Sequence, residues 1–457
     1  MSEIIASVSG IRGIIGDSLT PESIIKFTSA FAEYSLIHSK NKNIKIAVGR
    51  DGRLFGDVIE KIVTGNLLLC GVEVINLGSV PTPTVQIAAE ELKCAGGISI
   101  TASHNPRIWN GLKFLNPDGT FLDNKQIEKL LKIADRGNFK YAALDNLKAI
   151  KNDNSWLDKH IDKVLKLKIL DLNKIENRKF NVVVDAVNSS GSVIVPKLLE
   201  RLGCKVIRLF CDGSGIFPHI PEPIPENLVL LSMAVRKNKA DLGIAVDPDA
   251  DRLVLITDKG EPYGEENTIT AVANFVLKKT KDKNKNVTVN LSTTRSVDDI
   301  AKTHNAKVFR SAVGEINVVK EMMKNRSLIG GEGSGGVIYP ELHYGRDSLA
   351  GIVLILNELA DSGLSLSGHK NSLPRYFISK SKKMNVKDPD KMLKKIRDKF
   401  LKNKEVIKIW TNDGLKLDFK NYWVHLRKSN TEPVVRIITE ARSMEEAEKL
   451  QKQFLKF

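Results

Sequence analysis

The sequence predicts an α/β fold of three consecutive α/β domains with mixed or parallel sheets, followed by a C-terminal α+β domain, around a central cleft. Short runs rich in Val and Ile, each ending in a polar loop, alternate with longer segments of helical periodicity, which is typical of βα units. The 457 residues leave room for about three domains at roughly 150 residues each. The composition, 42% hydrophobic and 27% charged, is typical of a folded globular protein.

Four of the predicted strands lead directly into polar loops. These strands, each given with the first residue of its loop, are 45–48 with Gly49, 97–100 with Thr101, 181–184 with Asp185, and 242–246 with Asp247. Open α/β sheets bind ligands outside the carboxyl ends of their strands. We therefore expect the four loops to contribute to a ligand site.

Two helix starts are clearly marked. Thr20 is a candidate N-cap and is followed by Pro at the first helical position, after which apolar residues recur on one helical face through Tyr34. The last helix is predicted to begin at Ser443, where Glu446 three residues later completes a capping box.

Polar segments near 148–156, 258–260 and 367–371 are candidate linkers. They predict four domains: 1–152 with the loop at Ser103, 153–258 with an acidic loop, 259–370 with a glycine-rich loop, and 371–457 with a C-terminal polar loop.

The excess of basic residues, 70 Lys and Arg against 54 Asp and Glu, gives a net charge of +16. Such a charge favours anionic partners, either nucleic acid or phosphorylated metabolites. The densest basic cluster, residues 278–285, has the pattern of a helix end running into a loop, and no aromatic residues cluster among the basic ones. We therefore expect a small phosphorylated molecule and no nucleic acid.

The cysteines and the N-terminus bear on location. Cys70, Cys94, Cys204 and Cys211 show no zinc-ligand spacing, so we expect buried thiols in a reducing compartment. The N-terminus lacks the pattern of a signal peptide, and no window of about 18 apolar residues occurs. We expect a cytoplasmic protein that does not bind a membrane.

The strongest single motif is Asp247-Pro248-Asp249-Ala250-Asp251-Arg252, directly after a predicted buried strand. Three carboxylates at alternate positions repel one another unless a hard cation accepts them, and oxygen ligands suit Mg²⁺. An EF-hand would need Gly in place of Arg252, and a strand follows where its loop should continue. An acidic turn that caps two strands remains the structural alternative, while Arg252 adds a cation suited to a phosphate.

Ser103 lies at the end of a predicted strand within Thr101-Ala102-Ser103-His104-Asn105-Pro106. By itself this pattern fits a hydrogen-bonding loop residue as well as a nucleophile, because no G-x-S-x-G elbow is present. Lys113 is a candidate general base or phosphate anchor, with a solvated lysine as the alternative.

Two further loops offer polar groups. The glycine-rich stretch 330–336 lets the backbone approach a ligand and presents Glu332 and Ser334, but it lacks the Lys-Ser/Thr pair of a P-loop. The segment 427–433 joins two predicted strands. It combines a guanidinium with neutral hydrogen-bonding groups suited to a phosphate, although a polar hairpin has a similar composition: Arg427, Ser429, Asn430 and Thr431.

In chain order, the loops that contain Ser103, Asp247, Glu332 and Arg427 resemble four loops of the α-D-phosphohexomutase superfamily. Its members carry a TASHNP-like phosphoserine loop, a DPDADR-like metal loop, a GE-x-S sugar loop and an RKSNTEP-like phosphate loop. The resemblance spans the chain and includes Gly10-Ile11-Arg12-Gly13, which is similar to the family's N-terminal arginine loop. It implies an isomerase that interconverts hexose 6-phosphate and hexose 1-phosphate through a 1,6-bisphosphate, as a monomer or homodimer.

The resemblance also implies residue roles. Ser103 would be the phosphoserine, and its phosphate would ligate one Mg²⁺ with Asp247, Asp249 and Asp251. Residues that would assist the transfer are Arg12, His104, Lys113 and Arg252. Residues that would bind the sugar or its distal phosphate are Glu332, Ser334, Arg427, Ser429, Asn430, Thr431 and Arg436.

One position departs from the family pattern. Many members have His shortly after the sugar-loop Ser, where this chain has Gly336. His343 is a candidate replacement, with a helix-entry residue as the alternative. The opening segment 7–13 and the glycine-rich sugar loop are more similar to phosphoglucosamine mutases, so we expect glucosamine 6-phosphate as substrate, with mannose or glucose phosphate as the alternative. A metal-dependent phosphohydrolase would share the aspartates but would not need the loop at Arg427.

Overall fold

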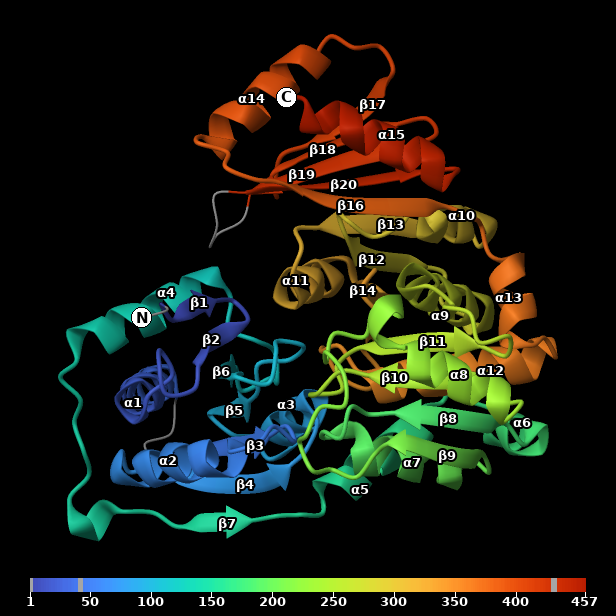
Figure 1. Cartoon of the computed structure of the whole chain (residues 1–457). Coiled ribbons are helices and arrows are strands. Elements are labelled where there is room, and N and C mark those ends of the chain that lie inside the picture. Colours follow the sequence, from blue (N-terminus) through green and yellow to red (C-terminus); the bar gives the residue numbers. More distant parts are fainter. Residues whose placement is uncertain (1–2, 40–43, 429–433) are drawn as a thin grey trace.

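Figure 1 shows the computed structural model, which describes residues 3–39, 44–428 and 434–457. The described residues form four β-sheets with helices packed on them, which confirms the predicted fold class. We name the regions after these sheets: domain 1 runs from β1 to β7, domain 2 from α5 to β11, domain 3 from α9 to α13, and domain 4 from β16 to α15.

Domain 1 contains a seven-stranded mixed sheet in the order β1-β2-β6-β5-β3-β4-β7. Strands β5, β3, β4 and β7 run parallel to one another, whereas β6 runs antiparallel to β5. The elements are β1 (Ile5–Ser7), β2 (Gly10–Ile14), α1 (Pro21–His38), β3 (Lys45–Arg50), α2 (Gly56–Leu69), β4 (Glu73–Ser79), α3 (Thr82–Glu91), β5 (Gly96–Ile100), β6 (Trp109–Leu115), α4 (Asn124–Arg136), the 3₁₀ helix η1 (Leu144–Asn146) and β7 (Ile150–Asn152).

Domains 2 and 3 each contain a four-stranded sheet, in the orders β11-β10-β8-β9 and β13-β12-β14-β15. The elements of domain 2 are α5 (Trp156–Leu165), α6 (Leu172–Arg178), β8 (Asn181–Asp185), α7 (Gly191–Arg201), β9 (Lys205–Phe210), η2 (Pro225–Asn227), α8 (Val229–Lys237), β10 (Leu242–Val246) and β11 (Leu253–Thr257). Those of domain 3 are α9 (Glu265–Lys279), β12 (Asn286–Asn290), α10 (Ser296–Thr303), β13 (Lys307–Ser311), α11 (Glu315–Asn325), β14 (Ile329–Glu332), β15 (Gly336–Ile338), α12 (Ser348–Ser362) and α13 (Leu366–Ser372).

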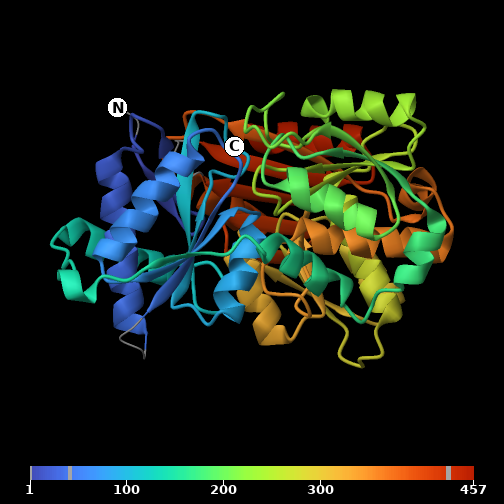
Figure 2. The same ribbon diagram turned by 90° about the horizontal axis from the view of Figure 1, so that it is seen from below.

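Domain 4 is an antiparallel five-stranded sheet, in the order β16-β20-β19-β18-β17, with two helices. Its elements are β16 (Phe377–Lys383), α14 (Pro389–Phe400), β17 (Val406–Trp410), β18 (Leu415–Phe419), β19 (Trp423–Lys428), β20 (Val435–Ala441) and α15 (Met444–Leu455). Figure 1 shows this domain stacked beyond domain 3, and Figure 2, seen from below, shows domain 1 beside the rest of the chain.

The predicted helix starts are present. The Thr20 side chain accepts a hydrogen bond from Ser23 N, and the Ser23 hydroxyl accepts one from Thr20 N, so α1 begins with a reciprocal capping box. Ser443 accepts from Glu446 N at the start of α15. The basic cluster 278–285 starts in the last turn of α9, which ends at Lys279, and continues into the following loop, as predicted.

Three expectations need correction. The segment 367–371, predicted to be a linker, lies within helix α13, because Ser365 accepts a hydrogen bond from Gly368 N and caps it. Gly330, Gly331 and Glu332, expected in a loop, belong to β14, where Val287–Val289 of β12 pair with Ile329–Gly331. The cysteines carry free thiols, but Cys70 and Cys211 are half-buried, so only Cys94 and Cys204 are core residues.

The hydrophobic core explains how the domains are joined. The largest apolar cluster is continuous through domains 1, 2 and 3, whereas domain 4 packs a separate core around Leu417 and Ile437. Domain 4 meets domain 3 through polar contacts such as those of Arg295, which donates hydrogen bonds to the carbonyls of Phe419, Lys420 and Tyr422. Polar interfaces of this kind permit domain motion more readily than a shared apolar core does.

One bent helix pair has the length and apolar composition of a membrane span. Within the described ranges no single helix is long and apolar enough to cross a bilayer, although α12 and α13 together, bent by 86°, meet the length and composition test. Helix α12 is buried along most of its length in the core of this structure.

Candidate active site

Ser103 faces the acidic loop across the boundary between domains 1 and 2. Ser103 follows β5 with φ of +48°, and its Oγ donates a hydrogen bond to Oδ2 of Asp247 over 2.9 Å. Both side chains are buried. The left-handed conformation is strained for a residue with a Cβ atom, and such strain is concentrated at functional positions.

Arg53 holds the Ser103 loop in this shape. Its guanidinium, only 2% exposed as a residue, donates to the carbonyl oxygens of Ser103, Asn105, Pro106 and Trp109. Asp51 in turn accepts hydrogen bonds from Arg53 and from the Thr101 hydroxyl (2.6 Å). These buried contacts tie the loop after β3 to the loop after β5.

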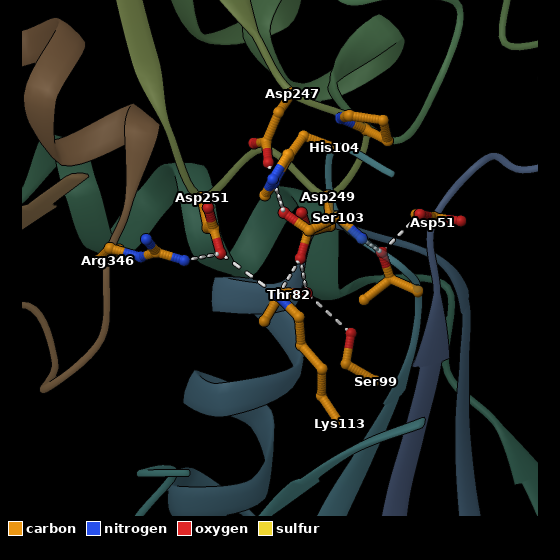
Figure 3. Close-up of polar contacts among 12 residues, drawn as sticks. Asp51, Thr82, Ser99, Ser103, His104, Lys113, Asp247, Asp249, Asp251 and Arg346 are labelled. Carbon is orange, nitrogen blue, oxygen red and sulfur yellow. Dashed lines mark hydrogen bonds and ion pairs between the residues drawn. The ribbon is translucent and has the colours of Figure 1, made fainter. Parts of the chain in front are cut away.

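The three aspartates form a compact buried group. Ligand oxygens of Asp247, Asp249 and Asp251 all lie within 4.8 Å of one another. Asp249 Oδ2 accepts hydrogen bonds from Thr82 Oγ1 (2.6 Å) and Lys113 Nζ (2.5 Å). Figure 3 shows Ser103 and Lys113 converging on this group from domain 1, while Arg346 approaches Asp251 from domain 3.

The charges in this group are unevenly balanced. Burial, followed by the charges of Asp251 and Asp249, raises the pKa of Asp247 well above its usual value. Burial also raises the pKa of Asp249, but the ammonium group of Lys113 and the Thr82 hydroxyl outweigh it and bring the pKa below its usual value. The neighbouring side chains therefore stabilise the negative charge of Asp249 but not that of Asp247.

The unpaired oxygens fit a hard divalent cation. Oδ1 of Asp249 and Oδ1 of Asp251 are both buried without a hydrogen-bond partner. A buried carboxylate oxygen without a partner is costly, and Mg²⁺ accepts such oxygens as ligands. No other group of three His, Cys, Asp or Glu side chains within residues 3–39, 44–428 and 434–457 lies close enough to hold a metal ion.

The predicted assisting residues surround Ser103. His104 Nδ1 lies 3.3 Å from Ser103 Oγ, and burial together with Arg252 and Arg12 lowers its pKa to about 2, so the ring is neutral. Burial lowers the pKa of Lys113, but Asp249 and Asp251 reverse this and raise it, so the lysine is charged. In this state Lys113 is a cation beside the aspartates and does not have the protonation state of a general base.

Two arginines lie on either side of the Ser103 loop. Arg12 on β2 donates from Nη1 to Oδ1 of Asn105 over 2.8 Å. The Arg252 amide donates to Oδ1 of Asp247, and the Arg252 guanidinium Nε lies 4.0 Å from Asp251 Oδ1. Both side chains add positive charge next to the aspartates.

The predicted sugar loop is a tight turn between β14 and β15. Ser334 is half-buried within it, whereas Glu332 at the end of β14 is 5% exposed. Glu332 accepts from Asn290 Nδ2 (2.8 Å), from Gly314 N (3.0 Å) and from Arg346 Nη1 (2.9 Å). Its carboxylate is therefore fixed before any sugar is present.

His343 does not join this loop. It is 4% exposed, and its Nε2 lies 3.1 Å from Oδ2 of Asp347, the N-cap residue of α12. His160 approaches the same oxygen within 2.8 Å. The structure thus places His343 in a buried contact at the entry of α12, as the structural alternative expected.

Basic residues gather at the end of the domain 4 sheet. Arg427 is directly opposite Arg436 in the β19–β20 pair, and Arg436 is directly opposite Lys382 in the β16–β20 pair. Like charges at opposed positions repel, so an anion at this edge would stabilise them. Asp413 Oδ2 lies 2.9 Å from Arg427 Nε and accepts a hydrogen bond from Val313 N of domain 3. The predicted residues Ser429, Asn430 and Thr431 lie outside the described residues.

Comparison with known proteins identifies the family. Four domain models of phosphoglucomutase/phosphomannomutase match in order: domain I over residues 4–141, domain II over 158–260, domain III over 265–377 and the C-terminal domain over 382–457. The chain belongs to this family. It is an isomerase of the α-D-phosphohexomutase superfamily, as the four loops predicted.

Individual phosphohexomutases resemble the whole chain. A phosphoglucomutase/phosphomannomutase of Thermococcus kodakarensis is 36% identical over 442 residues, covering 96% of this chain and 94% of the relative. A phosphoglucosamine/phosphogalactosamine mutase of Sulfurisphaera tokodaii is 32% identical, covering 95% and 94%. A family structure from Burkholderia thailandensis superimposes with a TM-score of 0.85 at 26% identity, covering 98% of this chain and 96% of that one.

Several residues around the phosphohexomutase site were not predicted. Arg53, Thr82 and Arg346 all contact the Ser103 loop or the aspartates. The only sequence signal for Arg53 was its place in a loop after a predicted strand. Thr82 and Arg346 had no signal, because neither lies in one of the four loops.

Proposed function

We propose that this phosphohexomutase interconverts glucosamine 6-phosphate and glucosamine 1-phosphate, with Ser103 carrying the phosphoryl group and a hexose 1,6-bisphosphate as the intermediate. The observation that carries this proposal is the 2.9 Å contact between Ser103 Oγ and Asp247 Oδ2 within a buried, oxygen-rich group. This contact supports the role of Ser103 as the residue whose phosphate would complete the ligand set of a cation.

Asp247, Asp249 and Asp251 would hold Mg²⁺. When bound, the ion would neutralise negative charge on the phosphoryl group during transfer. Lys113 and Arg252 add fixed positive charge beside the same place. Arg53 keeps the Ser103 loop in position through the backbone carbonyls that it binds.

The reaction would have two balanced steps. First the bond between phosphorus and Ser103 Oγ breaks, while a sugar hydroxyl oxygen forms a new bond to that phosphorus and the hydroxyl proton passes to Ser103 Oγ. After the bisphosphate has turned over, Ser103 Oγ attacks the other phosphorus, the bond between that phosphorus and its sugar oxygen breaks, and the sugar oxygen takes up the proton that Oγ releases. The neutral His104 ring, with Nδ1 3.3 Å from Oγ, is placed to accept a proton in the second step.

The basic edge of domain 4 would bind the phosphate that is not being transferred. Arg427, Arg436 and Lys382 lie on adjacent strands and supply the charge. Ser429, Asn430 and Thr431 are proposed to add neutral hydrogen-bonding groups, while Glu332 and Ser334 would contact sugar hydroxyls. Because the polar interface between domains 3 and 4 does not share an apolar core, domain 4 could adjust to the substrate.

The preference for glucosamine is supported by the glycine-rich sugar loop and by similarity to the Sulfurisphaera tokodaii enzyme, which is named for amino sugars. The Thermococcus kodakarensis relative is named for glucose and mannose phosphates instead, so a general hexose-phosphate mutase is the alternative. We expect the enzyme to act in the cytoplasm, where its free cysteines would stay reduced.

A turnover panel tests the proposal. The full chain is supplied with Mg²⁺ and with glucosamine, mannose or glucose 6-phosphate, each with a trace of its 1,6-bisphosphate, and formation of the 1-phosphate is followed. A kcat/KM for glucosamine at least about tenfold above the others, or about 1.4 kcal/mol of discrimination, supports the glucosamine preference. Comparable values support the general mutase. Free phosphate without any 1-phosphate would instead indicate a phosphohydrolase.

A further inference from the structure

Arg346 lies between three carboxylates that come from two domains. Its Nη2 donates to Asp251 Oδ2 (2.7 Å), its Nε to Glu315 Oε2 (3.0 Å) and its Nη1 to Glu332 Oε2 (2.9 Å). The residue is 9% exposed, so each ion pair is largely shielded from water. A planar guanidinium can serve three acceptors at once, whereas an ammonium group cannot hold them in fixed directions.

These contacts connect two parts of the site. Asp251 belongs to the aspartate group of domain 2, and Glu332 precedes the sugar loop of domain 3. Because Arg346 and Lys113 both bind Oδ2 of Asp251, the other oxygen, Oδ1, is left without a partner and is available to a cation. The position of Arg346 therefore determines how Asp251 is presented.

Glu315 extends the arrangement to domain 1. Its Oε1 accepts hydrogen bonds from the Arg346 amide (3.3 Å) and from Gln86 Nε2 on α3 (3.3 Å). Arg346 is therefore held by hydrogen bonds from its backbone amide as well as from its guanidinium group. A side chain fixed at this many points has little freedom to move aside.

Gly336 provides the space that Arg346 occupies. A Cβ atom at Gly336 would lie 2.4 Å from Cδ and 3.1 Å from Cγ of Arg346, and the nearest atoms around that position all belong to this arginine. Contacts below 3.0 Å require a shift, and the Arg346 side chain is anchored at both ends. Any side chain at position 336 therefore competes with Arg346 for one space.

We propose that Arg346 is a positioning residue of the phosphoryl-transfer site. It orients Asp251 for cation binding and holds Glu332 in a fixed position relative to Asp251, and the absence of a side chain at Gly336 leaves the space that Arg346 needs. This inference rests on the proposed function at Ser103. It gives a physical reason for Gly at position 336, where many family members have His. Arg346, two residues before α12, fills the space beside the sugar loop that a side chain at position 336 would occupy.

The test compares R346K with R310K in the full chain. Arg310 is also a buried arginine of domain 3, but it binds Asp298 and backbone carbonyls away from the aspartates. Mg²⁺ affinity is measured by calorimetric titration without sugar phosphate, together with kcat, KM and melting temperature. We expect R346K to bind Mg²⁺ about 10- to 100-fold more weakly and to lose kcat to a similar degree, because residues that orient metal ligands have effects of this size. R310K should keep the wild-type Mg²⁺ affinity.

A double-mutant cycle tests the role of Gly336. G336A should weaken Mg²⁺ binding about tenfold or more when Arg346 is present, and should add less than about a twofold effect to R346A, because the competing atoms are gone. Equal effects of G336A in both backgrounds would overturn the role of Gly336. A R346K variant with a lower melting temperature but unchanged Mg²⁺ affinity and kcat would overturn the positioning role.

The two proposals fail separately. If the wild-type chain converts no hexose phosphate, the proposed function fails, yet the Mg²⁺ titrations of R346K and G336A still report on Arg346. If R346A does not fold, R346K and G336A remain as independent single variants, because both keep a long, positively charged side chain at position 346.

Discussion

Oγ of Ser103 and Oδ2 of Asp247 lie 2.9 Å apart although 144 residues separate them in the chain. The serine follows strand β5 of domain 1 and the aspartate follows strand β10 of domain 2, so their contact depends on how the two domains pack. The same packing brings Thr82 and Lys113 of domain 1 to Asp249. The acidic group is thus completed by residues from outside its own loop.

Replacing Ser103 by Ala should abolish mutase turnover, reducing it by several orders of magnitude as expected for loss of a covalent nucleophile. The fold should persist, because alanine fills almost the same volume. Turnover and the phosphate content of the intact protein, read by mass spectrometry, check this expectation. Ser192→Ala, at another buried serine on α7, serves as the control and should keep both activity and phosphate. Wild-type turnover by Ser103→Ala would contradict the mechanism.

Replacing Asp247 by Asn should stabilise the metal-free protein and abolish its response to Mg²⁺. The change removes one of three buried carboxylates, and both burial and the repulsion from Asp251 and Asp249 raise the pKa of Asp247. In the wild type, Mg²⁺ at about 100 times its Kd should stabilise the fold by about 2.7 kcal/mol. Thermal melting with EDTA and with Mg²⁺ measures both effects. The exposed Asp398→Asn variant should behave like the wild type, and an undiminished Mg²⁺ response in Asp247→Asn would exclude this residue as a ligand.

Replacing Arg427 by Ala should raise KM for a hexose phosphate about 10- to 100-fold, because a hydrogen bond to a charged group contributes about 1.5–3 kcal/mol. The affinity for Mg²⁺, which would be bound by the aspartates of domain 2, should not change. Steady-state kinetics and calorimetric titration with Mg²⁺ provide the check. The exposed Arg442→Ala variant in the same domain is the matched control. An unchanged KM would remove Arg427 from the proposed phosphate site.

Stability should depend on pH through Glu266, whose half-buried carboxyl packs against Gly333 of the sugar loop. Burial raises the pKa of Glu266 to about 7 from 4.5, despite the opposing charge of Lys380. Between about pH 5 and pH 7 the folded protein therefore binds a proton that the unfolded chain has released, and stability from this group falls as the pH rises.

Glu266→Gln should remove that dependence. Its melting temperature should match the wild type near pH 5 and exceed it by several degrees near pH 8, because each kcal/mol of stability shifts the midpoint by about 2–4 °C. Melting curves at the two pH values are sufficient. Glu448→Gln, at an exposed position on α15, should show no such difference between them. A constant offset at both pH values would show that Glu266 does not titrate in this range.

The local features of this chain could be predicted from its sequence. Strand β10 covers the predicted residues 242–246, α1 starts after Thr20, and the Asp247 loop follows its strand at once. Periodicity, capping residues and the spacing of carboxylates are local, so they depend on neighbouring residues only. The order of the four loops was also sufficient to predict the family.

Tertiary packing decided which of the charged residues act together. Arg53 and Arg346 appear in the sequence as ordinary arginines, yet each is buried against carbonyls or carboxylates brought from distant segments. His343 looked equally suitable for the sugar loop, but its ring is committed to Asp347. Ion pairs and hydrogen bonds act over a few ångströms, so partners far apart in the chain are fixed only when the four sheets are packed together. The sequence by itself determined the loops and their chemistry, while only the folded arrangement determined that Arg346 occupies the space beside Gly336.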